Sequence, residues 1–191
     1  MIPTSRYATF LALAVGGCTV DLATKAWIFG WPPGPGRRGE WWLIESYCGI
    51  QKALNPGALF GMGQGFGLGF ATLSLAALVG IVLWLFVFQA AQDRLLTVAL
   101  GSVCGGILGN LYDRLGMHGL VNEDGQALRV VRDWILFCYH DHIWPNFNIA
   151  DCLLVCGAGL LALHSFRPWQ KNDLVSSETK PDVAPTSSQV A

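Results

Sequence analysis

The chain has 191 residues, of which 52% are hydrophobic and only 13% are charged. A typical soluble domain has about a quarter of its residues charged, so this composition and the mean hydropathy of +0.42 indicate an integral membrane protein. The formal net charge of −1 provides no basic field, which argues against a nucleic-acid partner.

The first apolar segment covers residues 7–31 and is longer than the ~20 residues that a helix needs to cross a bilayer. Asp21 and Lys25 lie within it at a spacing of i, i+4. This spacing puts both side chains on one helix face, where they can form a pair directed into a bundle. The alternative interpretation is an ordinary ion pair at the end of the helix.

A loop and two short strands are predicted to follow. Residues 32–38 are rich in proline and glycine and predict an exposed loop. Residues 41–44 and 47–50 are aromatic and β-branched, which predicts short strands at the membrane surface. Asn55 and Gly57 flank a proline in a turn whose small residues allow a peptide substrate to approach the backbone. A plain turn that enters a helix is the alternative.

Three further apolar segments cover residues 66–91, 95–115 and 147–166. The chain is therefore predicted to be an all-α membrane protein with four transmembrane helices in a domain of residues 1–169. Residues 170–191 are rich in Ser, Thr, Pro and charge, and are predicted to form a disordered tail.

Glycines recur every four residues in the third segment, at Gly101, Gly105 and Gly109. Small residues at this spacing allow two helices in lipid to pack closely, so this face is predicted to contact a neighbouring helix.

Four spans place both termini on the same side of the membrane. The Lys and Arg residues on the two sides are nearly balanced, so their number does not decide the orientation. The short Asp93-Arg94 turn and the basic Arg167 and Lys171 after the last span favour both termini in the cytoplasm. The opposite ends of the helices are then expected near the outer leaflet.

Polar residues gather at that predicted outer boundary. Asn110, Asp113 and Arg114 are spaced i, i+3, i+4, and Asn148 and Asp151 are spaced i, i+3, so each set lies on one helix face. Ionisable groups beside a membrane span are costly and are functional candidates by default.

Three carboxylates fall at this boundary: Asp113, Asp133 and Asp151. Two neighbouring carboxylates do not both ionise readily, so one holds a proton while the other acts as a base. Such a pair can activate water and hydrolyse a peptide bond without a covalent intermediate. Spacing alone leaves open which two form the pair, because Asp113 can pair with Arg114, Asp151 can cap a helix, and Asp133 lies in a connector expected to be flexible.

Other chemistries have weaker support in the sequence. His140 and His142 form only a His-x-His pair, and neither the HExxH nor the GxSxG motif is present. We therefore expect no metal and no cofactor. A channel, transporter or lipid-binding protein using the carboxylates for ions or protons is the competing class, although no inverted repeat is visible.

The chain resembles the bacterial lipoprotein signal peptidases, also called signal peptidase II, over nearly all residues up to about 167. The resemblance rests on five motifs in the family's order: Asp21-Leu22-Ala23-Thr24-Lys25, Asn55-Pro56-Gly57-Ala58-Leu59-Phe60-Gly61, Gly105-Gly106-Ile107-Leu108-Gly109-Asn110-Leu111-Tyr112-Asp113-Arg114, Val131-Arg132-Asp133-Trp134 and Phe147-Asn148-Ile149-Ala150-Asp151.

The resemblance implies a four-helix bundle with a small extracytoplasmic β-cradle and a short surface helix. It implies an aspartic endopeptidase of the bacterial inner membrane that removes the signal peptide just before a diacylglyceryl-modified cysteine. The expected partners are prolipoprotein substrates and membrane lipid, and the expected oligomeric state is a monomer.

Matched motif by motif, the resemblance assigns catalysis to Asp133 and Asp151. The residues implied to support the fold or position substrate are Asn55, Gly57, Asn110, Arg114, Asn148, Ala150, Asp21, Lys25 and Asp113. Residues 122–129 read as an insertion, and Trp134 replaces the family's usual Phe. If the insertion shifts the register, Asp113 becomes the alternative partner of Asp151.

Overall fold

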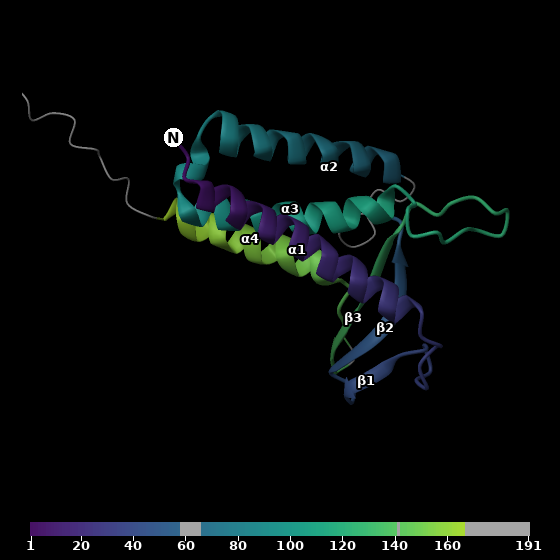
Figure 1. Ribbon diagram of the computed structural model, residues 1–191. Helices are drawn as coiled ribbons and strands as arrows, with labels where there is room; N and C mark the ends of the chain where they lie inside the picture. The colour runs from purple at the N-terminus through teal and green to yellow at the C-terminus, as the bar shows by residue number, and fades with distance from the viewer. Residues whose placement is uncertain (58–65, 141, 167–191) are drawn as a thin grey trace, which may run out of the picture.

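The computed structural model describes residues 1–57, 66–140 and 142–166. Four α-helices run side by side within these residues (Figure 1). Their bounds are Thr4–Phe29 for α1, Gly67–Val82 for α2, Arg94–Arg114 for α3 and Ile149–Ser165 for α4.

Three helical segments are long and apolar enough to cross a membrane: Thr4–Phe29, Gly67–Val87 and Arg94–Arg114. The second of these consists of α2 and a π-helical turn, Leu83–Val87, and a 3₁₀ turn, Ala90–Gln92, then leads into α3. Helix α4 is apolar but has 17 residues, or about 25 Å of helix, close to the lower limit for a span.

A small antiparallel sheet extends from one end of the helices (Figure 1). Its strands, in the order β1-β2-β3-β4, are Trp41–Ile44, Cys48–Asn55, Val131–Tyr139 and His142–Ile143. The two strands predicted after the first loop are confirmed.

The expectation that Asp133 lies in flexible sequence is wrong. Asp133 is the third residue of β3, which pairs with β2 over most of its length. The polar character of the connector as a whole hid a run of aromatic and β-branched residues, Val131 to Tyr139, that favours a strand. The predicted short surface helix is not found in the described residues, and the predicted tail, 170–191, lies outside them.

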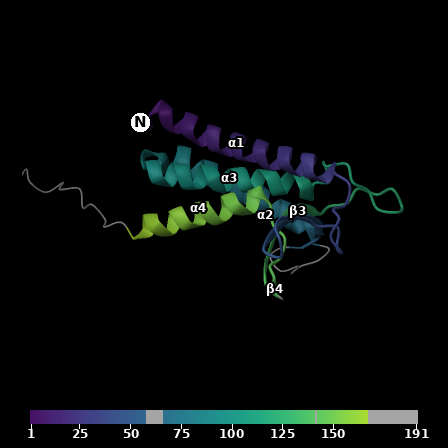
Figure 2. The same ribbon diagram turned by 90° about the horizontal axis from the view of Figure 1, so that it is seen from below.

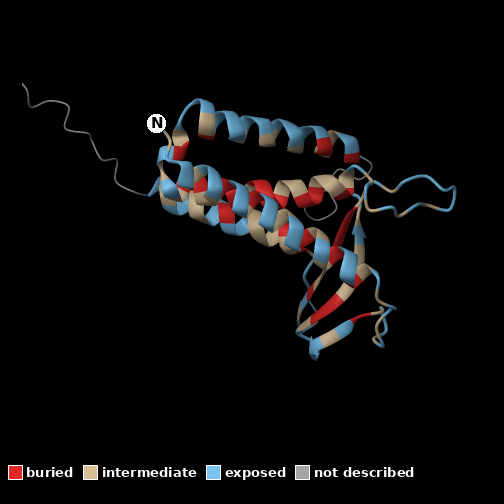
Figure 3. Ribbon diagram, in the orientation of Figure 1, coloured by how far each residue is buried: buried red, intermediate tan, exposed pale blue. Residues whose placement is uncertain are grey.

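Helix α3 is the centre of the bundle. Within the apolar window of α3, 61% of the residues are buried, against 17% in α1 and 11% in α2, and Figure 3 shows the buried residues concentrated along it. Seen from below, α1, α3 and α4 are stacked in order (Figure 2).

The predicted glycine face of α3 packs against α1. A Cβ atom at Gly105 would lie 2.9 Å from the Leu13 carbonyl oxygen, and one at Gly101 would lie 3.2 Å from Leu13 Cβ. On another face of α3, a Cβ atom at Gly106 would lie 2.5 Å from the Ala150 carbonyl oxygen of α4. The two neighbouring helices are therefore as close to α3 as glycine allows.

Replacing Gly105 with alanine is expected to force α1 away from α3 and to cost about 1–3 kcal/mol of stability, as overpacking typically does. Gly80→Ala is the matched control, because a Cβ atom at Gly80 meets nothing within 4 Å. Thermal unfolding in detergent is the measurement. Equal unfolding temperatures for the two variants would show that the contact is not tight.

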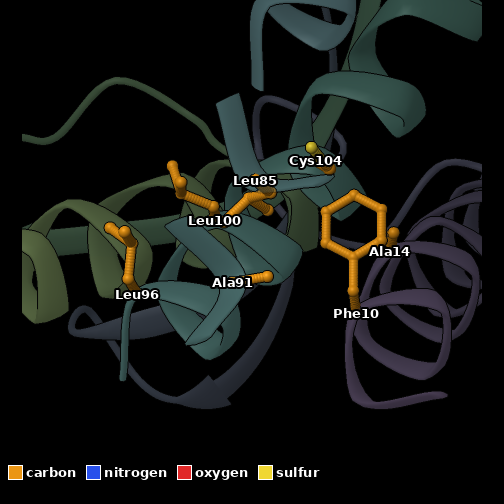
Figure 4. Close-up of a cluster of buried hydrophobic side chains, with 7 residues drawn as sticks. All are labelled: Phe10, Ala14, Leu85, Ala91, Leu96, Leu100 and Cys104. Atoms are coloured by element: carbon orange, nitrogen blue, oxygen red, sulfur yellow. The ribbon is translucent and has the colours of Figure 1, made fainter. Parts of the chain in front are cut away.

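The apolar core is a cluster of buried side chains on the helices (Figure 4). It joins the start of α1, the π-helical turn and the start of α3, and its buried members are Phe10, Ala14, Leu85, Ala91, Leu96, Leu100 and Cys104. At the end of the bundle beside the sheet, many of the buried side chains are polar instead.

Candidate active site

Buried polar side chains converge where the sheet meets the helices. Asp21 and Lys25 come from α1, Asn110 and Asp113 from α3, Asp133 from β3 and Asn148 from the start of α4, and all are at most 4% exposed. Burying this many polar groups is costly unless each has a partner, so their contacts define the site.

Strand β3 and the start of α4 are held together by backbone hydrogen bonds. The Ile135 N–H donates to the Phe147 carbonyl oxygen at 2.8 Å, and the Phe147 N–H donates back to Ile135 at 3.2 Å. Asn148 follows Phe147 directly, so this pairing places its side chain beside Asp133. A connection through β4 thereby joins two motifs that are separated in the sequence.

Helix α4 begins with a capping box. The Asp151 N–H donates to Asn148 Oδ1 at 3.0 Å, and the Asn148 N–H donates to Asp151 Oδ2 at 3.1 Å. Asn148 is thus the N-cap, while Asp151 lies in the first turn. These two hydrogen bonds restrain the orientation of both side chains.

Asp133 accepts hydrogen bonds from two asparagine amides. Asn148 Nδ2 donates to Asp133 Oδ1 at 2.6 Å, and Asn55 Nδ2 donates to Asp133 Oδ2 at 3.2 Å. The Gly57 N–H donates to Asn55 Oδ1 at 3.0 Å, so the amide group of Asn55 is held with its nitrogen toward Asp133.

The same amides connect Asp133 to Asp151. Asn148 Nδ2 also lies 3.1 Å from Asn110 Oδ1, and Asn110 Nδ2 donates to Asp151 Oδ1 at 2.9 Å. The two carboxyl groups are therefore linked through Asn148 and Asn110. Of the three aspartates that spacing left open, these two share the same amide bridge.

Burial, and after it the negative charge of Asp151, together raise the pKa of Asp133 to about 7. Hydrogen bonds from Asn148 and Asn55 oppose this shift without cancelling it. Asp133 is 2% exposed, so it can hold a proton near neutral pH while most carboxyl groups are ionised.

Asp113 is occupied by a different set of contacts. Its Oδ1 accepts from Arg132 Nη2 at 2.8 Å and from Nε at 3.1 Å, and its Oδ2 accepts from the Arg132 backbone N–H at 2.9 Å. Lys25 Nζ lies 3.3 Å from the same Oδ2. Asp113 thus anchors β3 to α3 and has no direct hydrogen bond to Asp133 or Asp151 among those described.

Lys25 completes the buried network. Its Nζ lies 2.7 Å from Asp21 Oδ2 and 2.9 Å from Asn110 Oδ1. Asp21 Oδ1 in turn accepts from the Ala150 N–H of α4 at 2.9 Å. The pair predicted to face a bundle interior does so, and it ties α1 to both α3 and α4.

Arg114 is placed differently from the other predicted site residues. Its guanidinium group lies over the Phe70 ring of α2, 5.5 Å from the ring centre, and the charges of Asp151 and Asp133 act on it. Among the described residues, no carboxylate lies close enough to the Arg114 guanidinium group to form a salt bridge with it. Its cationic end is therefore beside the carboxyl pair without neutralising either one.

Sequence reasoning gave no role to Arg132, which holds Asp113. Its position directly before Asp133 could have indicated a role once residues 131–139 are recognised as a strand. Successive side chains of a strand point to opposite faces, so Arg132 points away from the side that Asp133 faces. Among the described residues there is no group of three or more His, Cys, Asp or Glu side chains that could hold a metal ion.

Comparison with known proteins adds independent information. The family described as signal peptidase (SPase) II matches residues 13–167. A lipoprotein signal peptidase of Rhodopirellula baltica is 50% identical over 165 residues, covering 86% of this chain and 74% of that protein. A lipoprotein signal peptidase of Symbiobacterium thermophilum is 33% identical over 156 residues, covering 81% of this chain and 91% of that protein.

A solved structure of a bacterial membrane enzyme has a similar fold. It superposes with a TM-score of 0.67 at 25% identity and covers 83% of this chain and 87% of that chain. The family match spans most of the chain and contains all the residues of the amide-bridged site. The chain therefore belongs to the signal peptidase II family, and it is a membrane protease.

Proposed function

We propose that the protein is an aspartic endopeptidase that cleaves diacylglyceryl-modified prolipoproteins just before the lipidated cysteine. Asp133 and Asp151 are the catalytic residues in this proposal. The observation that carries it is the carboxyl pair formed by the buried Asp133 and the half-buried Asp151, linked through Asn148 and Asn110 at the end of an apolar bundle.

In the proposed reaction, Asp133 holds a proton and directs it to the oxygen of the scissile carbonyl. Asp151 takes a proton from a water molecule, and the resulting hydroxide forms the new bond to the carbonyl carbon. Breakdown of the tetrahedral intermediate breaks the C–N bond, and the leaving nitrogen takes up a proton from the pair. Asn148 and Asn110 hold the two carboxyl groups in fixed positions relative to each other throughout the reaction.

The substrate is suited to a site at a membrane boundary. The signal helix of a prolipoprotein lies in lipid, and its two acyl chains occupy one monolayer. Both anchors bring the scissile bond to the depth at which the bundle meets the sheet. Four spans, with both termini in the cytoplasm of a bacterial inner membrane, would place this site near the outer leaflet.

Arg114 and Asn55 are proposed to position the peptide. Arg114 carries a charge beside the pair that no described carboxylate neutralises, and Asn55 closes the site from the end of β2. Lys25, Asp21, Asp113 and Ala150 have a structural role, since their polar groups bind one another, Asn110 or Arg132 rather than an open position.

The cleavage rate is expected to fall as the pH rises above about 7. Asp133 must be protonated to act as the acid, and burial together with the charge of Asp151 raises its pKa to about 7. The protonated fraction then decreases about tenfold for each further pH unit. Initial rates at precursor concentrations well below KM measure this, because kcat/KM reports the pKa values of the free enzyme. A kcat/KM that stays constant well above this pH would contradict the assignment of Asp133 as the acid.

The proposed substrate is tested with two synthetic precursors that differ only in the cysteine. One carries the diacylglyceryl group and the other a free thiol, and both are added to the protein in vesicles. We expect cleavage before the cysteine of the lipidated precursor alone. No cleavage of either precursor would overturn the proposed function, and equal cleavage of both would overturn the lipid requirement.

A further inference from the structure

One end of the sheet carries a cluster of exposed apolar side chains far from the carboxyl pair. The turn between β1 and β2 and the turn between β3 and β4 meet there, because the Cys138 N–H donates to the Tyr47 carbonyl oxygen at 2.8 Å. The rings of Tyr47 and Tyr139 lie 6.5 Å apart across these turns. We call this end the distal rim; its exposed members include Leu43, Ile44, Tyr47, Phe137, Tyr139 and Ile143.

The exposure of the rim is high for apolar residues. Leu43 is 69% exposed, Tyr139 is 65% exposed and Ile44 is 61% exposed. A contiguous apolar patch on a protein surface marks a contact with a partner or a membrane. Tyrosine is enriched where proteins meet the lipid headgroups, and the rim contains Tyr47 and Tyr139.

The placement of the sheet favours lipid as the partner. The strands run from the end of the bundle across the direction of the helices, so the distal rim lies to the side of the bundle rather than beyond it (Figure 1). A membrane crossed by the helices would therefore have its surface beside the rim. The segment of residues 116–129, by contrast, projects beyond the bundle along the helix direction and has a polar tip, Asn122 to Gly125 (Figure 1).

An aromatic path joins the rim to the lipid-facing surface of the bundle. Trp27 of α1 is 64% exposed, and its ring contacts Trp31 with 5.0 Å between centres. Trp31 contacts Trp41, the first residue of β1, at 6.3 Å. Apolar surface thus continues from a membrane-spanning helix to the strand that carries Leu43.

From these observations we propose that the distal rim is a second membrane contact, inserted into the headgroup region beside the bundle. Its partner is the phospholipid surface. Apolar groups of this kind enter the bilayer boundary to a depth of ~5–10 Å. The contact would hold the sheet, and with it Asp133 and Asn55, at a fixed height relative to the bilayer.

The test places a photoreactive benzoylphenylalanine at position 43 or 139 of the full chain in vesicles of phosphatidylethanolamine and phosphatidylglycerol. Position 73 is the positive control, because Leu73 of α2 is 67% exposed on an apolar span. Position 121 is the matched negative control, because Val121 is an apolar residue, 56% exposed, on the projecting segment. Intact-mass spectrometry after irradiation identifies the adducts.

We expect a phospholipid adduct at positions 43, 139 and 73, and none at 121. The proposal is overturned if 43 and 139 give no lipid adduct while 73 does, if 121 gives the same yield as 43 and 139, or if the adduct joins two copies of the chain. No precursor is present, so the result is independent of whether the protein cleaves the proposed substrate.

Discussion

Replacing Asp133 with asparagine is expected to abolish cleavage of the lipidated precursor, and Asp151→Asn should do the same. Each change removes one partner of the proposed acid–base pair, and general acid–base catalysis alone contributes ~10²–10⁴-fold to a rate. Single-turnover cleavage in vesicles is the measurement. Asp124→Asn, which alters an exposed carboxylate on the projecting segment, is the matched control and should retain full activity.

The Asp133→Asn variant should remain folded, which separates lost chemistry from lost structure. In an unfolded chain the pKa of this group is 3.8, and burial together with the charge of Asp151 raises it to about 7 in the fold. Its contribution to stability is therefore complete below the lower value and is lost as the pH rises through the higher one. An asparagine at position 133 has one acceptor oxygen in place of two, so it loses one of the two accepted hydrogen bonds, worth about 1 kcal/mol. It also never ionises, so it does not incur the cost of a buried charge.

At about pH 8 the unfolding temperature of Asp133→Asn should thus equal or exceed that of the unaltered protein. Full cleavage by Asp133→Asn, together with inactivity of a folded Asp113→Asn variant, would instead assign the catalytic role to Asp113. The contacts of Asp113 with Arg132 and Lys25 lead us to expect the opposite.

Replacing Lys25 with methionine is expected to cause the largest loss of stability. Lys25 Nζ lies 2.7 Å from Asp21 and 3.3 Å from Asp113, and all three side chains are fully buried. Removing one partner of a buried ion pair leaves an uncompensated charge and costs about 3–5 kcal/mol. The measurement is thermal unfolding in detergent, with the exposed Arg37→Met as the control for loss of a surface charge.

A second variant tests whether the lost charge pairing is the cause. Asp21→Asn combined with Lys25→Met removes both charges of the pair, while Asp113 keeps its contacts with Arg132. This double variant should regain part of the stability lost in Lys25→Met. If Lys25→Met alone unfolds at the same temperature as the unaltered protein, the buried network does not hold the bundle together.

The helices could be predicted from the sequence because a membrane span has a strong local signal. Length and apolar composition located residues 7–31, 66–91 and 95–115 to within a few residues of the observed helices. The glycine spacing also predicted the close approach of Gly105 to α1, because steric room depends on the residue itself.

Strand β3 was missed because its signal is short and its partners are distant. Nine residues, Val131–Tyr139, lie in a long connector whose other residues are polar, and β3 pairs with a strand about 80 residues earlier. The local composition carried the strand preference, but the pairing that makes it a strand is a property of the tertiary fold.

The composition of the site was more predictable than its connections. Helical spacing grouped Asn110 with Asp113, and Asn148 with Asp151, but it did not distinguish the aspartate bound by Arg132 from those bound by asparagine amides. That distinction depends on β3 lying between α3 and α4. Resemblance to a family selected Asp133, and the geometry of the amide bridge gives a physical reason for the same choice.

The most direct test of a proton-sharing pair is the titration of Asp133 itself, followed by carboxyl infrared or ¹³C NMR signals that disappear in Asp133→Asn. We predict a midpoint near the raised pKa of about 7 in the unaltered protein. Asp151→Asn should lower this midpoint, but not to the ordinary value, because burial remains. Asp133 titrating as an ordinary carboxyl group, with no response to Asp151→Asn, would contradict the coupling on which the proposed mechanism depends.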